Sequence, residues 1–489
     1  MAVSNQVHLI TYPDSLGGSL AALRQVLGSR FPGLFPGGIH LLPPFPSSGD
    51  RGFAPLTYEE IEPAFGTWND VQGINETAPV MLDLMVNHMS RQSAAAQDFL
   101  AVGRRSRYAD LFLTPEKVWG GDTPPAADIG KIFLRRGSPF SGYRQGDTGE
   151  ELQLWTTFGS QHPSEQIDLD WRSPAYRRFM TETLGSLRQR GIRLLRLDAV
   201  GYVVKKAGTS CFFVEPEIWE YLAWIRGLAD ERGMEILPEV HAGPAVQGAL
   251  AAHGYWVYDF VLPYRVLEAL VVGDPLALRR HLAGRTGRQF TMLDCHDGIP
   301  VKPDLDGLYD AERVRRVTEV CRERGARFNR VVSASHRDGD GFDVHQINCS
   351  YYSALGEDDD ACVAARALQV FAPGVPQVYY VGLLAGGNDV AAVRRTGEER
   401  EINRHNYSTE EIDANLRRPV VQRLVRLLRL RNGHPAFGGV FRVLPAGASE
   451  VRVQWQAPGG TCTLTVDLSS RASVVESAEP GRPVLREKL

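Results

Sequence analysis

The chain has 489 residues, of which 43% are hydrophobic and 23% charged, as in ordinary globular proteins. This length exceeds what one simple core contains, so we expect a large central domain with smaller ones attached. The net charge of −4 and the scattered basic residues argue against a nucleic-acid partner. Every apolar run is shorter than the roughly 20 residues that span a bilayer, which argues against a membrane partner.

The first residues, MAVSNQVHLITYPDSLGG, enter a strand-like run without the basic leader, apolar stretch and cleavage site of a signal peptide. The 6 cysteines are scattered and form neither CxxC pairs nor zinc-like spacings. Reduced thiols are the natural interpretation. Together these features predict a cytoplasmic protein.

Short apolar runs of strand length alternate with helix-like segments along most of the chain. The strand candidates are GIHLLPPF, PVMLDLMVNH, IRLLRLDAV, MEILPEVH, WVYDFVL, QFTMLDCHD and PQVYYVG. A helix is predicted over 174–190, because Ser173 suits the N-cap, Pro174 the first helical position and Gly191 the stop. This alternation predicts a parallel sheet, as an α/β barrel or a doubly wound fold.

Polar residues at the ends of these strands favour the barrel. A (β/α)8 barrel gathers the carboxyl ends of all its strands around one mouth, where active sites of this fold lie. No GxGxxG or P-loop follows an early strand, which weakens the doubly wound alternative. The residues at strand ends are Asn87, His88, Asp198, Glu239, His241, His296 and Asp297.

The alternation of strands and helices is interrupted by two long segments, and near the C-terminus it is replaced by strands alone. Residues 87–170 and 298–354 are predicted insertions, here called subdomains B and B′, in a barrel formed by residues 1–86, 171–297 and 355–435. The segments VFRVLPAG, EVRVQWQAP and CTLTVDLSS alternate in the manner of an antiparallel sheet. Residues 436–489 are therefore predicted to form a C-terminal antiparallel β domain.

Three acids, Asp198, Glu239 and Asp297, follow three different strands. Like charges brought together cost stability, so their convergence indicates either a metal site or acid/base chemistry. A metal site with His88, His241 and His296 lacks short-range ligand spacing. A retaining glycoside enzyme needs an ionised nucleophile and a protonated acid about 5–5.5 Å apart, which fits better.

Arg196 stands two residues before Asp198, on the same side of a strand, where it would keep the carboxylate ionised. The alternative for this pair is a buried ion pair that only stabilises the fold.

Longer segments carry a resemblance to known proteins. LDLMVNHMS, LLRLDAVGY, ILPEVHAG and MLDCHDG resemble the signature segments of the α-amylase superfamily. VHLITYPDSLG, EQIDLD, DAVGYVVKKAGTSCFF, SYYSALG, PGVPQVYYVGLLAGGND and REINRHNYS resemble its sucrose phosphorylase family across nearly the whole chain. The resemblance implies a (β/α)8 barrel with two inserted subdomains and a C-terminal antiparallel β domain.

The resemblance also implies roles for individual residues. Asp198 would be the nucleophile, Glu239 the general acid/base and Asp297 the transition-state stabiliser. Asp50 could instead be a turn residue and Phe158 ordinary core. Asn87 matches a position that often binds calcium in amylases, but this family is not thought to need the metal, so we expect no metal and no cofactor. The residues expected around the glucosyl unit and its leaving group are Asp50, Phe53, His88, Phe158, Gln166, Arg196, His241, His296, Asp343 and Arg400.

The acceptor pocket is where the chain departs from the family pattern. His345 stands where sucrose phosphorylases carry a tyrosine, and Arg135 lies at a position that binds phosphate in the family. With Arg136, these residues predict an anionic acceptor, so that sucrose 6′-phosphate and inorganic phosphate would give α-glucose 1-phosphate and fructose 6-phosphate. Sucrose, glucosylglycerol and glucosylglycerate remain alternative substrates.

Two other classes of protein stay open. An α-glucoside hydrolase would use the same three acids, and a non-catalytic homologue would bind sugar without turning it over. Small-molecule sugars and phosphate are the expected partners, and the chain is expected to be a monomer or a homodimer.

Overall fold

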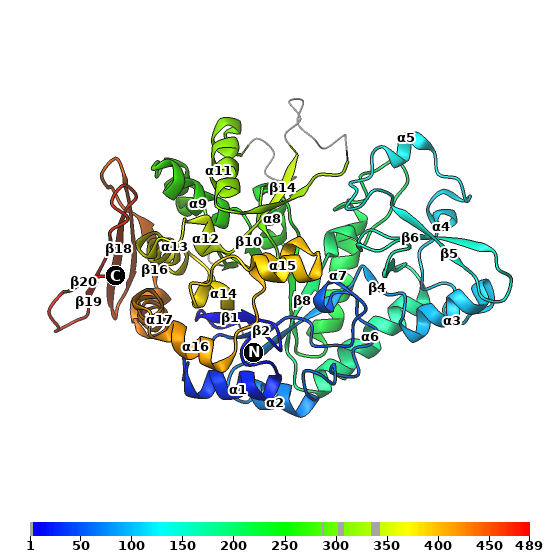
Figure 1. The fold of residues 1–489 in the computed structure, drawn as a ribbon, viewed down its shortest axis with the longest axis horizontal. Coiled ribbons are helices and arrows are strands. Elements are labelled where there is room, and N and C mark those ends of the chain that lie inside the picture. Colours follow the sequence, from blue (N-terminus) through cyan, green and yellow to red (C-terminus); the bar gives the residue numbers. More distant parts are fainter. Residues whose placement is uncertain (1–2, 286–287, 302–307, 334–342) are drawn as a thin grey trace. The chain divides into compact units, whose positions relative to one another are not determined.

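The computed structural model describes residues 3–285, 288–301, 308–333 and 343–489 (Figure 1). These residues form two compact units. The first unit contains residues 41–240, 331–333 and 343, and the second contains residues 3–40, 241–330 and 344–489 apart from the gaps. The units are not the four predicted domains, whose boundaries stay predictions.

An eight-stranded sheet has the hydrogen-bonded order β10-β11-β15-β1-β2-β3-β8-β9. The pairs β1–β15, β11–β15, β10–β11, β3–β8 and β8–β9 are parallel. Helices alternate with these strands along the chain, as in a (β/α)8 barrel. The strands are β1 (His8–Thr11), β2 (Gly38–Leu41), β3 (Val80–Met85), β8 (Leu194–Asp198), β9 (Glu235–Pro238), β10 (Val257–Asp259), β11 (Gln289–Thr291) and β15 (Val375–Tyr379).

In the first unit, β3 and β8 set the positions of the charged residues. Every residue of β3 is buried, and its partner β8 is buried up to Asp198 at its end. The parallel register places Asp83 opposite Arg196 and Met85 opposite Asp198. A carboxylate within an apolar strand is therefore brought beside the only cationic residue of β8.

Helix α6 (Pro174–Gln189) follows the predicted pattern. The Ser173 side chain accepts a hydrogen bond from the amide of Tyr176, and Pro174 occupies the first turn. The helix buries Met180, Leu184 and Leu187 on one face. Gly191 adopts a φ of 91° just beyond the helix, a conformation that favours glycine. Helices α2 (Trp68–Asn75) and α7 (Glu217–Asp230) also belong to this unit.

The segment between β3 and α6 forms two small antiparallel ladders, β4–β7 and β5–β6. Leu113, Ile132 and Trp155 of this segment form a small core together with Cys211, which lies beyond β8 in the chain. Its elements are β4 (His88–Ser90), α3 (Ala94–Val102), α4 (Pro115–Trp119), α5 (Ala126–Ile129), β5 (Phe140–Arg144), β6 (Glu151–Trp155) and β7 (Gln166–Asp168).

In the second unit, β12 (Ile299–Pro300), β14 (Val344–Asn348) and β13 (Arg327–Arg330) form a separate antiparallel sheet. The helices are α1 (Leu20–Ser29), α8 (Pro244–Ala252), α9 (Leu262–Val272), α10 (Leu276–Ala283), α11 (Ala311–Glu323), α12 (Tyr351–Ala354), α13 (Asp359–Phe371), α14 (Tyr380–Leu383), α15 (Val390–Thr396), α16 (Thr409–Leu416) and α17 (Pro419–Gly433).

The C-terminal residues form a five-stranded antiparallel sheet, drawn in brown to red in Figure 1. Trp455 fastens this sheet to α13, because its buried indole N–H donates to the carbonyl of Phe371 at 2.8 Å. The strands are β16 (Val440–Val443), β17 (Glu450–Ala457), β18 (Gly460–Asp467), β19 (Ser473–Ala478) and β20 (Leu485–Lys488). The predicted antiparallel pairing is confirmed.

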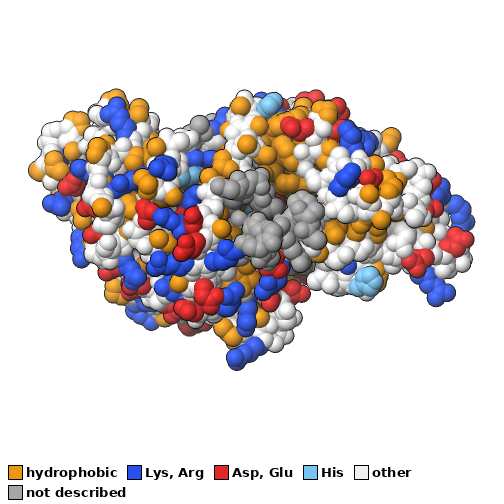
Figure 2. Space-filling model, turned by 90° about the horizontal axis from the view of Figure 1, so that it is seen from above, with side chains coloured by type: hydrophobic (Ala, Val, Ile, Leu, Met, Phe, Trp, Pro, Cys, Tyr) orange, Lys and Arg blue, Asp and Glu red, His pale blue; other side chains and the backbone are white. Residues whose placement is uncertain are grey.

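The surface carries both signs of charge. On the face drawn in Figure 2, Lys and Arg side chains are interspersed with Asp and Glu, in keeping with the small net charge of −4. Among the described residues, no helix has both the length and the apolar character needed to cross a bilayer.

Candidate active site

Arg196 and Asp198 form the centre of the candidate site in the first unit. The Arg196 Nη1 atom donates to Asp198 Oδ1 at 2.9 Å, and the same nitrogen bonds Asp83 Oδ1. Arg196 is only 4% exposed, and Asp83 is fully buried. A buried guanidinium between two carboxylates favours their ionised forms. The contact with Arg196 therefore favours the anionic form of Asp198.

Glu239 directly follows β9 and contacts the same guanidinium. Its Oε1 atom lies 3.5 Å from Arg196 Nη2, and its Oε2 atom accepts a hydrogen bond from the amide of Ala199 at 2.9 Å. Ala199 has a left-handed φ of 55°, which is unusual for a residue other than glycine. The turn after Asp198 thus aims a backbone N–H at Glu239.

Two neighbours of this pair were not found from the sequence. Tyr58 shares hydrogen bonds with the backbone of Met85, beside Asp198 in the register, with the amide of Met85 2.9 Å from its hydroxyl. Burial raises the pKa of Tyr58 far above its usual value, and the charges of Asp198 and Asp83 add to this effect. In the sequence, Asp83 is one acidic residue within an apolar run. Its ion pair with Arg196 could not be predicted, because it depends on the register between β3 and β8.

Aromatic residues and a histidine lie next to Arg196. The Phe53 ring is 5.9 Å from the Arg196 guanidinium carbon, and the Phe53 carbonyl is 2.9 Å from His88 Nε2. The ring of Phe158 lies 5.4 Å from that of His88. Burial lowers the pKa of His88, so its ring is neutral near pH 7 and presents one donor and one acceptor. Such a wall suits a polar sugar ring with apolar faces.

Two further predicted residues lie near this wall. Asp50 is an exposed residue with a left-handed φ of 45°, and its negative charge acts on the pKa of His88. Gln166 is buried in β7 and pairs with Ser90 of β4. Asp50 therefore lies close enough to His88 to influence its pKa, and its contact with substrate stays a prediction.

The two adjacent arginines have different surroundings. Arg135 lies over the Phe158 ring at 5.9 Å and lines a small recess with Tyr202 and Lys205. Arg136 also borders the recess, but its guanidinium donates to four oxygens of its own subdomain. These are the hydroxyls of Ser141 and Thr156 and the carbonyls of Phe158 and Gln161. The bonds favour a structural role for Arg136, and its place at a substrate phosphate stays a prediction.

In the second unit, Asp297 lies beside the side chains of Arg400 and His296. Its Oδ1 atom lies 3.0 Å from Arg400 Nη1, and its Oδ2 atom lies 3.7 Å from His296 Nε2. Asn403 and Arg404, which the sequence did not single out, donate to the backbone carbonyls of Asp297 and His296 at 3.3 and 3.0 Å. The segment that contains Arg400 is therefore fixed to the loop that carries Asp297.

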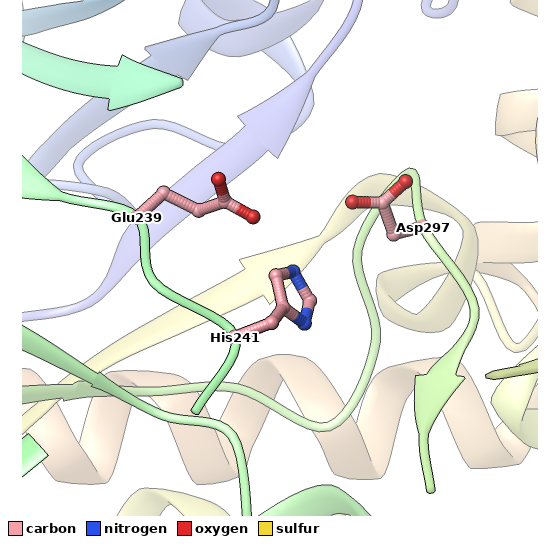
Figure 3. Close-up of side chains that lie close together, drawn as sticks. All are labelled: Glu239, His241 and Asp297. Carbon is pink, nitrogen blue, oxygen red and sulfur yellow. The ribbon is translucent and has the colours of Figure 1, made fainter. Parts of the chain in front are cut away.

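His241 stacks on Phe260 with ring centroids 4.0 Å apart. Figure 3 shows that Glu239 and His241 extend from the chain after β9, and Asp297 from the loop between β11 and β12. One ligand atom of His241 lies within 4.8 Å of one of Asp297.

The remaining predicted residues lie around the second insertion. His345 is a buried residue of β14 in the second unit, whereas Asp343 belongs to the first unit and accepts a backbone hydrogen bond from Val331. The first unit therefore gathers Phe53, His88, Phe158, Arg196, Asp198 and Glu239, and the second gathers His241, His296, Asp297 and Arg400.

Comparison with known proteins identifies the family. The α-amylase catalytic domain matches residues 34–245. Sucrose 6(F)-phosphate phosphorylase of Thermoanaerobacterium thermosaccharolyticum is 53% identical over 97% of both chains. Sucrose phosphorylase of Streptococcus mutans is 44% identical over 89% of both chains. A crystal structure of sucrose 6F-phosphate phosphorylase from Thermoanaerobacter thermosaccharolyticum superimposes with a TM-score of 0.98 and 52% identity, over 100% of this chain and 99% of that one.

The likeness to the crystal structure extends over the whole chain, including the C-terminal sheet. This likeness and the match to the α-amylase catalytic domain confirm the predicted (β/α)8 fold class and the resemblance read from the short segments. The relatives are phosphorylases, that is, glycosyltransferases built on the α-amylase fold. The chain belongs to the sucrose phosphorylase family of the α-amylase superfamily.

Proposed function

We propose that this protein is a retaining glycoside phosphorylase. It transfers the glucosyl unit of sucrose 6′-phosphate to inorganic phosphate and releases fructose 6-phosphate and α-glucose 1-phosphate. The observation that carries the chemistry is the Arg196 guanidinium, which holds Asp198 at 2.9 Å and Glu239 at 3.5 Å. The likeness to sucrose 6(F)-phosphate phosphorylase supports the choice of substrate.

In the first displacement, a carboxylate oxygen of Asp198 attacks the anomeric carbon of the glucosyl unit. Glu239 transfers its proton to the glycosidic oxygen as that bond breaks, and fructose 6-phosphate leaves. The product is a β-glucosyl ester of Asp198. Asp297, paired with Arg400, stabilises the positive charge that develops on the sugar ring.

In the second displacement, a phosphate oxygen attacks the same carbon and the ester bond to Asp198 breaks. Two inversions give net retention, hence α-glucose 1-phosphate. Phosphate is an anion at neutral pH, so it needs cationic donors more than a strong base. Arg135, at the recess beside Phe158, suits this role.

The substrate phosphate requires a second set of donors. His345, buried on β14, supports an anionic acceptor because an imidazole N–H can donate to a phosphate oxygen. We further propose that the enzyme works in the cytoplasm as a monomer or a homodimer, and that its barrel carries subdomains B and B′ and the C-terminal domain at the boundaries predicted above.

An acceptor panel tests this proposal. The purified protein is given α-glucose 1-phosphate together with fructose 6-phosphate, fructose, glycerol or glycerate, and phosphate release is measured. Fructose 6-phosphate should give the highest kcat/KM. A preference for fructose would make the enzyme a sucrose phosphorylase.

Phosphorolysis itself is tested with sucrose 6′-phosphate in the presence and absence of inorganic phosphate. A phosphorylase should form glucose 1-phosphate in proportion to phosphate and release little free glucose. Glucose release at the same rate in both conditions would instead identify a hydrolase.

A further inference from the structure

Residues 399–407 of the second unit, here called the Arg400 segment, meet the candidate active site on one side. The segment begins with the 3₁₀ turn Glu399–Asn403, which places Arg400 Nη1 3.0 Å from Asp297 Oδ1. Two further side chains of the segment donate to the backbone of the loop that carries Asp297. The position of the Arg400 guanidinium therefore depends on what holds this segment in place.

His405 joins the Arg400 segment to two helices. Its Nδ1 atom lies 2.6 Å from Asp389 Oδ2, and its Nε2 atom lies 3.2 Å from Glu411 Oε1. Asp389 is the N-cap residue of α15, and Glu411 belongs to the capping box of α16. A histidine ring donates from both nitrogens only when it is protonated, so both contacts are complete in the imidazolium form.

Asp389 bonds the Arg400 segment at two points. Its backbone amide donates to the carbonyl of Ile402 at 2.8 Å, within the turn that carries Arg400. Its carboxylate binds His405 through one oxygen and accepts from the amide of Ala392 through the other. Burial alone would raise the pKa of Asp389, but the hydrogen bonds from His405 and Ala392 lower it below its usual value. An ionised Asp389 thus connects the His405 ring to the turn around Arg400.

The end of the Arg400 segment has anchors of its own. Asn406 donates to Asp14 Oδ2 at 2.7 Å, and the amide of Tyr407 donates to the carbonyl of Ser15 at 2.9 Å. A substitution at His405 is therefore expected to change the geometry of the turn before it without detaching the segment from the second unit.

We propose that His405 is a positioning residue for Arg400 and, through Arg400, for Asp297. The role of Asp297 in stabilising charge on the sugar rests on the proposed function, whereas the link from His405 to Arg400 belongs to the fold. His405 acts through other residues and does not itself contact the substrate. A displacement of about 1 Å at a catalytic group can cost about 100-fold in rate, so a small shift of Arg400 is measurable.

Two isosteric substitutions separate the two contacts of His405. The amide nitrogen of asparagine takes the place of Nδ1, so His405→Asn keeps the bond to Asp389 and loses the one to Glu411. The amide nitrogen of glutamine takes the place of Nε2, so His405→Gln keeps Glu411 and loses Asp389. Because the proposed route runs through Asp389, His405→Asn should keep kcat/KM within about threefold of the wild type, whereas His405→Gln and His405→Ala should lose about tenfold.

The quantity measured is kcat/KM for fluoride release from α-glucosyl fluoride. It reports formation of the glucosyl-enzyme whichever acceptor takes the glucosyl unit afterwards, so it does not depend on the choice between phosphate and water. His253→Ala is the matched control, because that ring is exposed and bonds the carbonyl of Ala249 in α8 at 2.8 Å. Its kcat/KM and Tm should equal those of the wild type.

A double-mutant cycle tests the route from His405 to Arg400. In the Arg400→Ala background the side chain that His405 positions is absent, so His405→Gln should lower kcat/KM by less than about twofold. A loss as large as the one in the wild-type background would show that His405 acts by some other route, and would overturn the inference.

The thermal transition of each variant separates positioning from folding. Higher kcat/KM for His405→Asn than for His405→Gln, in proteins that both melt cooperatively above the assay temperature, supports the inference. Equal values for the two variants overturn it, and so does failure of all the His405 variants to fold. If the ranking holds but phosphate and α-glucosyl fluoride give no glucose 1-phosphate, the positioning role stands and the proposed function fails.

Discussion

Arg196 and Asp198 stand two residues apart on β8, and Arg196 Nη1 lies 2.9 Å from Asp198 Oδ1. The same nitrogen bonds Asp83 on the neighbouring strand, so the guanidinium is held from both sides. The ion pair therefore favours the ionised form of Asp198, which the proposed role of Asp198 as nucleophile requires.

Asp198→Asn tests the nucleophile. The amide keeps the shape of the side chain but cannot form the glucosyl ester, while Asp83 still pairs with Arg196. We expect transfer to fall below about a hundredth of the wild-type rate with an unchanged Tm. The rate of glucose 1-phosphate formation is measured on protein checked for deamidation. A larger residual rate would exclude Asp198 as nucleophile.

Glu239→Gln tests the acid/base role. Glutamine cannot protonate the leaving fructosyl oxygen, so turnover of sucrose 6′-phosphate should fall by about two to four orders of magnitude. Formation of the glucosyl-enzyme from α-glucosyl fluoride, whose leaving group needs no proton, should be much less affected. The burst of fluoride release is compared with turnover of the natural donor. Equal losses on both donors would contradict the assignment.

Asp83→Asn tests how much the ion pair between Asp83 and Arg196 contributes to the stability of the fold. Removing one partner of a buried ion pair is costly, and we expect a loss of about 3 kcal/mol in the free energy of unfolding. Urea denaturation measures this loss. Glu59→Gln is the control, because Glu59 pairs with Arg190 at 2.9 Å while its side chain is 58% exposed, and about 1 kcal/mol or less is expected. Similar effects of the two changes would contradict the prediction.

His345→Tyr and Arg136→Ala separate substrate recognition from loop structure. A hydrogen bond to a charged group contributes about 1.5–3 kcal/mol, so His345→Tyr should lower kcat/KM for sucrose 6′-phosphate at least about tenfold and leave sucrose nearly unchanged. Arg136→Ala should lower kcat/KM for both sugars together, because its bonds hold the Phe158 loop. A selective effect of Arg136→Ala would instead place that residue at the substrate phosphate.

His8 predicts an acid dependence of stability. Burial, helped by the nearby His40, lowers the pKa of His8 from 6.5 to about 3. Between pH 6.5 and pH 3, His8 is therefore protonated in the unfolded chain but neutral in the folded one. The free energy of unfolding falls as the pH drops through this range. Between pH 7 and pH 5 the wild type should lose about 2 kcal/mol more than His8→Leu, as measured by urea denaturation at both values. Parallel losses would show that His8 is not the group responsible.

The parts of the fold that depend on neighbouring residues in sequence were predictable. The cap of α6 and the placing of Arg196 and Asp198 on one side of a strand required only local geometry. The Asp83–Arg196 pair was not predictable, since strand register decides which side chains meet. The three oxygens that contact the Lys205 ammonium, from Asn87, Asp168 and Tyr202, likewise belong to segments that are separated in the sequence. The surroundings of Arg136 depend in the same way on the fold of its loop.

Ala199 has a consequence for the stereochemistry of the proposed reaction. Its left-handed φ of 55° turns the peptide after Asp198 so that the N–H reaches Glu239 at 2.9 Å. An inverting enzyme needs its two carboxyl groups about 6.5–9.5 Å apart, with a water molecule between them. A backbone hydrogen bond ties Glu239 to the residue after Asp198, and the Arg196 guanidinium contacts both acids. The main chain as well as the side chains therefore holds the two carboxyl groups on the same guanidinium, an arrangement that favours the proposed retaining reaction over an inverting one.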